Sequence, residues 1–101
     1  MKAIENLIGK RVIVRAHGAG VFYGTLNEVE GDTVELTQCR RLWYWDGAAS
    51  LSQLAAEGVK APERCKFTVV VESIVILNVI EIIPASKQAQ QSIECVKVWK
   101  R

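Results

Sequence analysis

The sequence predicts a mainly β protein, a small five-stranded barrel with one short inserted helix and short helical turns near both termini. Three observations support this fold class. Apolar and polar residues alternate in several short segments, as in strands with one buried face. Glycine, asparagine and aspartate separate these segments, as in tight turns. A length of 101 residues suits one hydrophobic core. We therefore expect residues 1–101 to form a single domain.

The first two strands are expected on either side of a glycine-rich turn. A helical turn over residues 1–7 precedes a strand over residues 12–16, in which valines alternate with basic or apolar residues. Residues 17–20 form the turn, and residues 21–29 resume the extended pattern. Gly24 lies inside this second strand, where the missing side chain permits a bend or a bulge.

The third strand is expected over residues 33–45 and leads into the inserted helix. Ser50 has the right chemistry to cap that helix, and Gln53 follows three residues later, as in a capping box. Gly58 is suited to end it. The sequence therefore predicts a helix of about two turns between the third and fourth strands.

The last third of the chain carries the remaining strands. Residues 66–77 predict one long strand that bends near residues 72–73, and residues 79–83 predict the fifth strand. Ser86 is placed to cap a helical turn that runs through Ile93. Residues 95–99 alternate again, and we expect them to pair along an open sheet edge.

Composition excludes several classes of protein. A net charge of only +2 gives no strong overall field for nucleic acid or membrane. The longest apolar runs are far shorter than the roughly 20 residues of a membrane span, and the first residues do not resemble a signal peptide, so we expect a cytoplasmic protein. Cys39, Cys65 and Cys95 are widely spaced and have only His17 as a possible imidazole partner. We expect reduced thiols, no metal site and no cofactor.

One segment stands out as a candidate binding site. Two arginines and three large aromatic residues fall within seven positions, although aromatic residues make up only 7% of the chain. A planar guanidinium can hold a phosphate, and an indole can stack on a base. A continuing strand would place Arg41 beside Trp43 and Trp45 on one face. The candidate binding residues are Arg40, Arg41, Trp43, Tyr44, Trp45 and Asp46.

A structural role for these residues remains open. Tryptophans are often core anchors or oligomer contacts, and an arginine can lie over an aromatic ring. Asp46 precedes the inserted helix and suits a helix cap better than an acid catalyst. The sequence carries no paired carboxylates, activated serine or phosphate loop, and His17 has no fixed catalytic partner. We therefore expect a binding protein and not an enzyme.

The strand pattern resembles that of the Sm-like family. The similarity lies in residues 9–14, 20–26, 32–36 and 79–84, which match the first three strands and the closing strand of that family. This resemblance implies a small barrel that tends to form rings. The RNA-reading residues of the family are not carried over, because residues 72–73 are Glu-Ser where the family has an arginine-glycine pair.

A second resemblance involves the middle of the chain. Residues 39–55 look like part of a family of small phage and prophage proteins of unknown function, and the similarity extends along the chain. It implies a viral or prophage origin and hence a host cytoplasm.

Together these features suggest a homo-oligomeric phage protein that sequesters a nucleotide-type immune signal of the host, such as a cyclic nucleotide or an ADP-ribose derivative. Two alternatives remain: an Sm-like ring that binds single-stranded RNA, and an interaction module that inhibits a host or phage protein.

Overall fold

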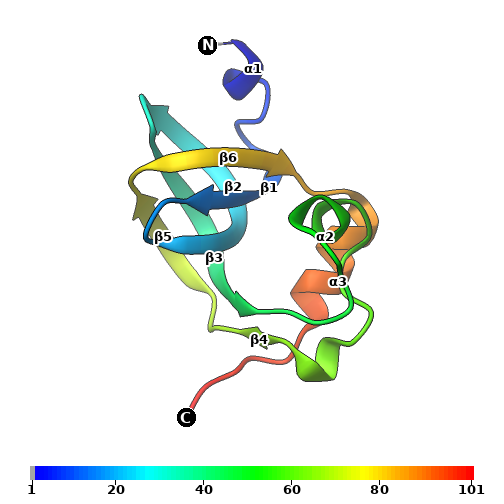
Figure 1. The fold of residues 1–101 in the computed structure, drawn as a ribbon. Coiled ribbons are helices and arrows are strands. Elements are labelled where there is room, and N and C mark those ends of the chain that lie inside the picture. Colours follow the sequence, from blue (N-terminus) through cyan, green and yellow to red (C-terminus); the bar gives the residue numbers. More distant parts are fainter. Residues whose placement is uncertain (1) are drawn as a thin grey trace.

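The computed structural model describes residues 2–101 and is dominated by one antiparallel sheet (Figure 1). The strands of these residues are β1 (Arg11–Ala16), β2 (Gly20–Glu30), β3 (Thr33–Tyr44), β4 (Lys66–Phe67), β5 (Val71–Ile76) and β6 (Val79–Pro84). The helices are α1 (Lys2–Glu5), α2 (Leu51–Glu57), the 3-10 helix η1 (Pro62–Arg64) and α3 (Lys87–Cys95). The predicted mainly β class is therefore confirmed.

The sheet has the strand order β4-β3-β2-β1-β6, and β5 pairs with β3 as well. The first half of β3 contacts β5, from Val34 opposite Ile76 to Cys39 opposite Val71, and its second half contacts β4. The ladders within residues 2–101 do not join β5 to β6, so the sheet is open. These ladders therefore do not confirm the predicted five-stranded barrel.

The predicted fourth strand, over residues 66–77, is wrong as a single element, because it is divided into β4 and β5. Thr68 lies at the break. Its hydroxyl accepts a hydrogen bond from the Arg41 N–H at 3.0 Å, and its own N–H donates to the Arg41 carbonyl at 3.1 Å. The side chain thus replaces a backbone acceptor, and the chain leaves the ladder at this point.

A bulge in β3 lies opposite Gly24. The register between β2 and β3 shifts between Tyr23 and Thr25, and Gln38 has a φ of 47°. A Cβ atom at Gly24 would lie 3.0 Å from the Thr37 carbonyl oxygen, so a larger residue would force its neighbours to move. A bend or a bulge was predicted at this glycine, and a bulge is present, with its extra residue on β3. Because of the extra residue, Leu36 and Leu42 belong to different hydrophobic clusters although their spacing would otherwise put them on one face.

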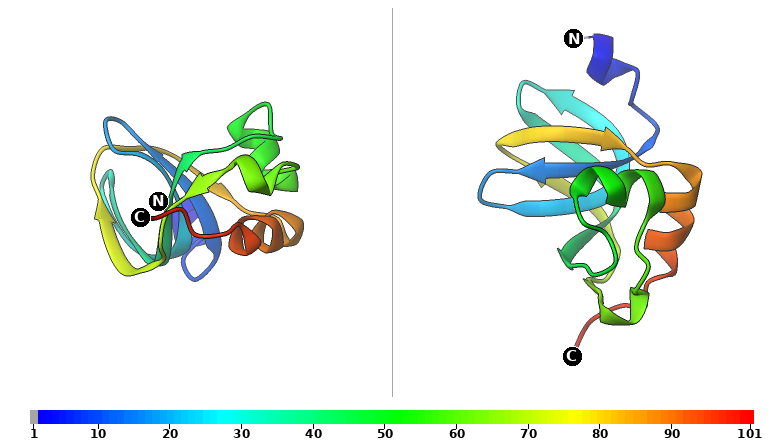
Figure 2. Two further views of the ribbon diagram at one scale, coloured as in Figure 1. Left: turned by 90° about the horizontal axis from the view of Figure 1, so that it is seen from below. Right: turned by 45° about the vertical axis from the view of Figure 1, so that its right-hand side comes forward.

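Two hydrophobic clusters occupy the two faces of the sheet. One lies inside the curve of the sheet and consists of Val12, Val14, Ala16, Phe22, Leu26, Val34, Leu36, Cys39 and Ile76. The other lies between the sheet and the helices and consists of Ile13, Tyr23, Leu42, Leu54, Ala55, Val59, Cys65, Phe67, Ala85, Ala89, Ile93 and Val96. Figure 2 shows α2 and α3 together on this second side.

The helix caps agree with the sequence. The Ser50 hydroxyl accepts from the Gln53 N–H, the Gln53 side chain accepts from the Ala49 N–H, and Gly58 ends α2 with a φ of 80°. Ser86 caps α3, which is longer than the single predicted turn. Within residues 2–101 no helix is long and apolar enough to cross a membrane.

The C-terminal segment follows the edge of β4, at the lower end of the molecule in Figure 1. Cys95 still belongs to α3, and the described residues after it form no strand, so only part of the edge pairing predicted for residues 95–99 is present. Val98 forms a parallel bridge with Phe67, and the Trp99 N–H donates to the Phe67 carbonyl at 2.9 Å. The edge that this segment covers therefore belongs to its own chain.

Candidate functional site

Arg40, the first of the predicted binding residues, is buried in the core, with 3% of its surface exposed. Its guanidinium donates hydrogen bonds of 3.0 to 3.1 Å to four backbone carbonyls, those of Phe67, Thr68, Ile93 and Val96. Burial lowers the pKa of this group. The bulge at Gln38 turns Arg40 toward α3, where it satisfies carbonyls at the end of the helix. Arg40 therefore joins β3, β4 and α3.

Arg41, the next residue, is exposed. Its guanidinium carbon lies 4.8 Å from the centre of the Phe22 ring, in a cation–π contact. Within residues 2–101 no hydrogen-bond or ion-pair partner engages its side chain. Arg41 lines a crevice of about 290 Å³ whose other walls include His17, Phe22 and Leu77. Its charge is therefore available to a ligand.

Trp43 forms an exposed aromatic pair with Trp99. The two rings are stacked and nearly parallel, with an interplanar angle of 8° and centroids 6.3 Å apart. Trp43 is 63% exposed and Trp99 is 46% exposed. Lys66 lies over the Trp99 ring, with its ammonium nitrogen 5.6 Å from the centroid. We call Trp43, Trp99 and Lys66 the aromatic platform.

The fold brings these three residues together from three segments. The register between β3 and β4 shifts between Leu42 and Tyr44, so Trp43 is the extra residue of a bulge. Lys66 belongs to β4, opposite Tyr44, and Trp99 arrives through the parallel bridge between Val98 and Phe67. The platform thus depends on the pairing of β4 on both of its edges.

The other predicted residues have separate surroundings. Tyr44 is half exposed. Trp45 lies beyond the end of β3 and packs against the cluster under the helices, so it does not share a face with Trp43. Asp46 forms an ion pair of 3.5 Å with Arg64. Asp46 does not cap the inserted helix, because Ser50 does.

Two members of the platform were absent from the sequence-based prediction. Trp99 lies 56 residues beyond Trp43, and Lys66 looks like an ordinary strand residue. The alternation of residues 95–99 was the available signal, because it indicated that the segment pairs with a sheet edge. It did not indicate which edge, and that choice brings Trp99 to Trp43.

A second polar group lies between the sheet and α3. Tyr23 donates a short hydrogen bond to Glu94, and Arg11 donates to both side chains at 3.2 and 3.3 Å. Burial, followed by the bond to Glu94, raises the pKa of Tyr23 to about 12. Burial also raises the pKa of the Cys39 thiol to about 11. The Tyr23 hydroxyl and the Cys39 thiol therefore retain their protons, which is typical of groups with a structural role.

The metal-binding chemistry of the described chain is limited. Within residues 2–101, no group of three or more histidine, cysteine, aspartate or glutamate side chains is arranged to hold a metal ion. The three cysteines are free; Cys39 and Cys65 are buried and Cys95 is exposed. What the platform offers to a ligand is aromatic stacking and the positive charge of Lys66.

Comparison with known proteins gives one family. None of the curated proteins compared with this chain matches it. A protein family described as a domain of unknown function, DUF6948, matches residues 9–93. That match spans all six strands and most of α3, and Trp99 lies beyond it. The chain belongs to the DUF6948 family.

Proposed function

We propose that this protein is a non-catalytic binding domain that captures a nucleotide-type ligand on the aromatic platform. The observation that carries the proposal is the pair of exposed, stacked indole rings with a lysine ammonium beside it. Large aromatic rings exposed to water are costly unless a partner covers them. A base covers such a ring and gains about 1 to 3 kcal/mol from stacking.

The charges near the platform suit the phosphate of the same ligand. Lys66 belongs to the platform, and Arg41 precedes Trp43 by two residues of β3, with its guanidinium over Phe22 in the neighbouring crevice. Lys97 and Lys100 flank Trp99 in sequence and are exposed. A base on the indoles can therefore place its phosphate within reach of a cation. Arg40 has no part in this contact, because its donors already serve four carbonyls.

The biological role in this proposal is sequestration. A protein that binds a signal without changing it lowers the free concentration of that signal, and a phage gains from such a protein when the signal activates host defence. The resemblance to small phage proteins supports this setting. A cyclic nucleotide or an ADP-ribose derivative has both the base and the phosphates that the site requires.

Tryptophan fluorescence provides a direct test. In a Trp45→Phe variant, the only indoles left are Trp43 and Trp99, so quenching reports on the platform alone. We expect cyclic dinucleotides, cyclic trinucleotides or ADP-ribose isomers to quench this signal in a saturable way. Trp43→Ala and Trp99→Ala should each weaken binding by about 1 to 3 kcal/mol, measured by calorimetry on the otherwise unchanged chain. Arg41→Ala should weaken it by about 1.5 to 3 kcal/mol.

Two controls make the result decisive. Arg64→Ala removes an arginine that already pairs with Asp46 and should leave binding unchanged. A single-stranded oligonucleotide, titrated at several salt concentrations, tests the RNA-binding alternative. If the oligonucleotide binds and no small nucleotide does, the RNA-binding hypothesis replaces nucleotide capture. If neither binds, nucleotide capture is rejected and the platform is a protein contact.

A homo-oligomer whose subunit is a small, Sm-like β domain with an open sheet is part of the same proposal. Only one edge of β5 is paired, and Val75 on this strand is 59% exposed. Pairing of two β5 edges across a twofold axis would cover them. Light scattering at micromolar concentration should give a multiple of the monomer mass, which is 11.2 kDa. A monomer at every concentration would reject this part alone.

A further inference from the structure

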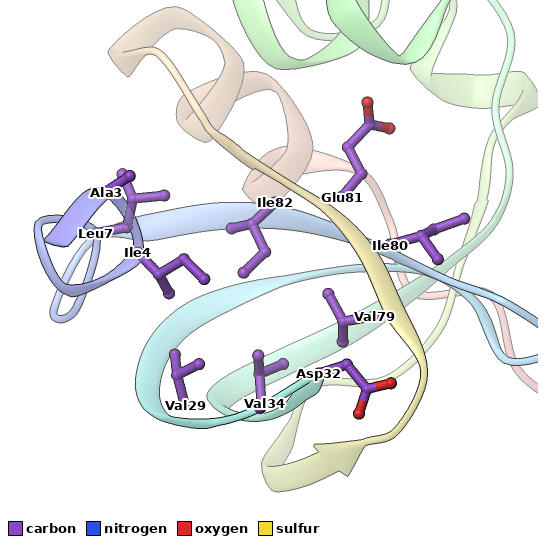
Figure 3. Close-up of a pocket in the computed structure, with 11 residues that line it drawn as sticks. Ala3, Ile4, Leu7, Val29, Asp32, Val34, Val79, Ile80, Glu81 and Ile82 are labelled. Atoms are coloured by element: carbon purple, nitrogen blue, oxygen red, sulfur yellow. The ribbon is translucent and has the colours of Figure 1, made fainter. Parts of the chain in front are cut away.

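An apolar groove lies at the other end of the molecule from the platform. It is bounded by α1, the turn between β2 and β3, and β6, and its volume is about 340 Å³ (Figure 3). The apolar side chains that line it are Ala3, Ile4, Leu7, Val29, Val34, Val79, Ile80 and Ile82. Ile80 on its rim is 56% exposed. The groove is therefore an opening into the cluster inside the sheet.

The backbone beside the groove has an edge that joins no further strand beyond Val79. Among the described residues β6 ends the strand order and pairs with β1; on its other side the Val79 N–H already donates to the Asp32 carbonyl at 2.9 Å. A strand with one neighbour leaves half of its backbone N–H and carbonyl groups on the free side. The register to β1 shifts beside Ile80, between Glu81 and Val79, so Ile80 is the extra residue of a bulge. An extended segment that pairs with this edge would lie along the groove.

The side chains of β6 specify what such a segment must carry. Val79 and Ile82 pack on the inner cluster, whereas Glu81 lies on the outer face and pairs with Arg15 at 3.0 Å. Figure 3 shows Glu81 pointing away from Val79. A neighbouring strand would therefore place one face of its side chains beside aliphatic groups and its other face beside a carboxylate.

The uncompensated charge at the groove is negative. Among the described side chains that line it, the titratable groups are the carboxylates of Asp32 and Glu81, and Glu81 already pairs with Arg15 at 3.0 Å. The Asp32 side chain has no hydrogen-bond or ion-pair partner within residues 2–101. Glu28 and Glu30 extend the negative charge along the neighbouring end of β2. A basic segment is thus favoured over an acidic one.

We propose that the groove and the free edge of β6 bind an extended segment of a partner protein in which aliphatic residues alternate with lysine or arginine. The segment adds a strand to β6 beyond Val79, its aliphatic side chains enter the groove beside Val79 and Ile82, and its basic side chains lie beside Asp32. This interaction is independent of nucleotide capture, because it shares no residue with the aromatic platform.

Two matched peptides test the proposal. A fluorescein-labelled ten-residue peptide of alternating valine and lysine should bind the full chain in a fluorescence anisotropy titration, and the same peptide with glutamate in place of lysine should not. Asp32→Lys should weaken binding at least tenfold. Glu63→Lys, an equal charge reversal on η1 away from the groove, should change the affinity less than twofold. Thermal melts of both variants report whether each is folded.

Hydrogen exchange tests the position of the segment. The bound lysine peptide should slow exchange of backbone amides in β6, because a new strand protects the free edge. Three results would overturn the proposal: equal binding of both peptides, no effect of Asp32→Lys in a folded variant, or no added protection in β6. Saturation by hexylamine at the affinity of the peptide would assign the groove to small amines instead. Self-association that the peptide cannot compete with would assign it to a second copy.

Discussion

The two halves of β3 hold their charged residues in opposite ways. Before the bulge at Gln38, Glu35 is partly exposed and accepts hydrogen bonds from the side chains of Ser73 and Asn27 at 2.6 and 2.7 Å. After the bulge, Arg40 is buried and donates to four carbonyls. One bulged residue separates Glu35, whose carboxylate reaches water, from Arg40, which is enclosed by β4 and α3.

This difference shows what decides the role of a charged side chain in a small domain. Glu35 can exchange its hydrogen-bond partners for water at little cost. The carbonyls around buried Arg40 would have no water molecule as a replacement donor. Adjacent arginines show the same contrast, since Arg41 is exposed and lies over Phe22. The buried arginine stabilises the fold, and the exposed one is available for binding.

The largest expected effect comes from removing the buried arginine. Arg40→Ala should lower the free energy of unfolding by about 3 to 5 kcal/mol, because four carbonyls lose their donor and a cavity remains. Arg41→Ala should change it by less than about 0.5 kcal/mol. Urea denaturation followed by circular dichroism measures both. If Arg40→Ala does not fold, Arg40→Lys should still be folded and less stable than the parent chain; equal stability of Arg40→Lys and the parent would contradict the assigned role.

A substitution at Gly24 tests the bulge that separates the two halves of β3. Gly24→Ala should destabilise the protein by about 1 to 3 kcal/mol, because the new methyl group would lie 3.0 to 3.1 Å from Thr37 and Cys39. Gly18→Ala is a comparison in open space, where no atom lies within 4 Å, and its cost comes only from a φ of 82°. Thermal unfolding of the two variants should show the larger decrease for Gly24→Ala.

A smaller effect is expected at the aromatic platform. Trp43 and Trp99 should show a coupling energy of about 0.5 to 1.5 kcal/mol in a double-mutant cycle with alanine, as for other stacked aromatic pairs. Because both rings are partly exposed, each single variant should remain folded. Chemical denaturation of the four proteins gives the coupling. A value of zero would mean that the rings do not stack in solution.

The smallest effect is expected at Glu35. The hydrogen bond from Ser73, followed by that from Asn27, lowers its pKa below the ordinary value of 4.5. A depressed pKa stabilises the folded state above pH 4.5, and that contribution is lost as the pH falls through the folded value. Carbon-13 NMR titration should show the low pKa, and Ser73→Ala should raise it toward 4.5. An unchanged pKa in Ser73→Ala would show that the hydroxyl does not bond Glu35.

Local patterns in the sequence predicted local structure well. Ser50, Gly58 and Ser86 were identified as caps because each needs only its own neighbours to form its hydrogen bonds. The irregular pairing at Gly24 could also be predicted locally, because a missing side chain within a strand permits a bend or a bulge. These features depend on residues close in sequence, so a single sequence is sufficient to find them.

Long-range contacts account for the differences. The predicted strand over residues 66–77 is divided because the Thr68 hydroxyl bonds to Arg41, 27 residues earlier. The two arginines look alike in sequence, yet the bulge turns Arg40 toward the end of α3, more than 50 residues away. Alternation in the binding segment gave no sign of this, because a bulge shifts the face of every later residue.

The contact between Arg40 and the carbonyls of Ile93 and Val96 also has a consequence for synthesis of the chain. The ribosome makes β3 early, but two of the four acceptors for its arginine belong to the last part of the described chain. Until Val96 has emerged, the guanidinium must stay in water, and the face of the sheet that α3 covers remains incomplete. The nascent chain therefore cannot close this core until the residues through Val96 have left the ribosome.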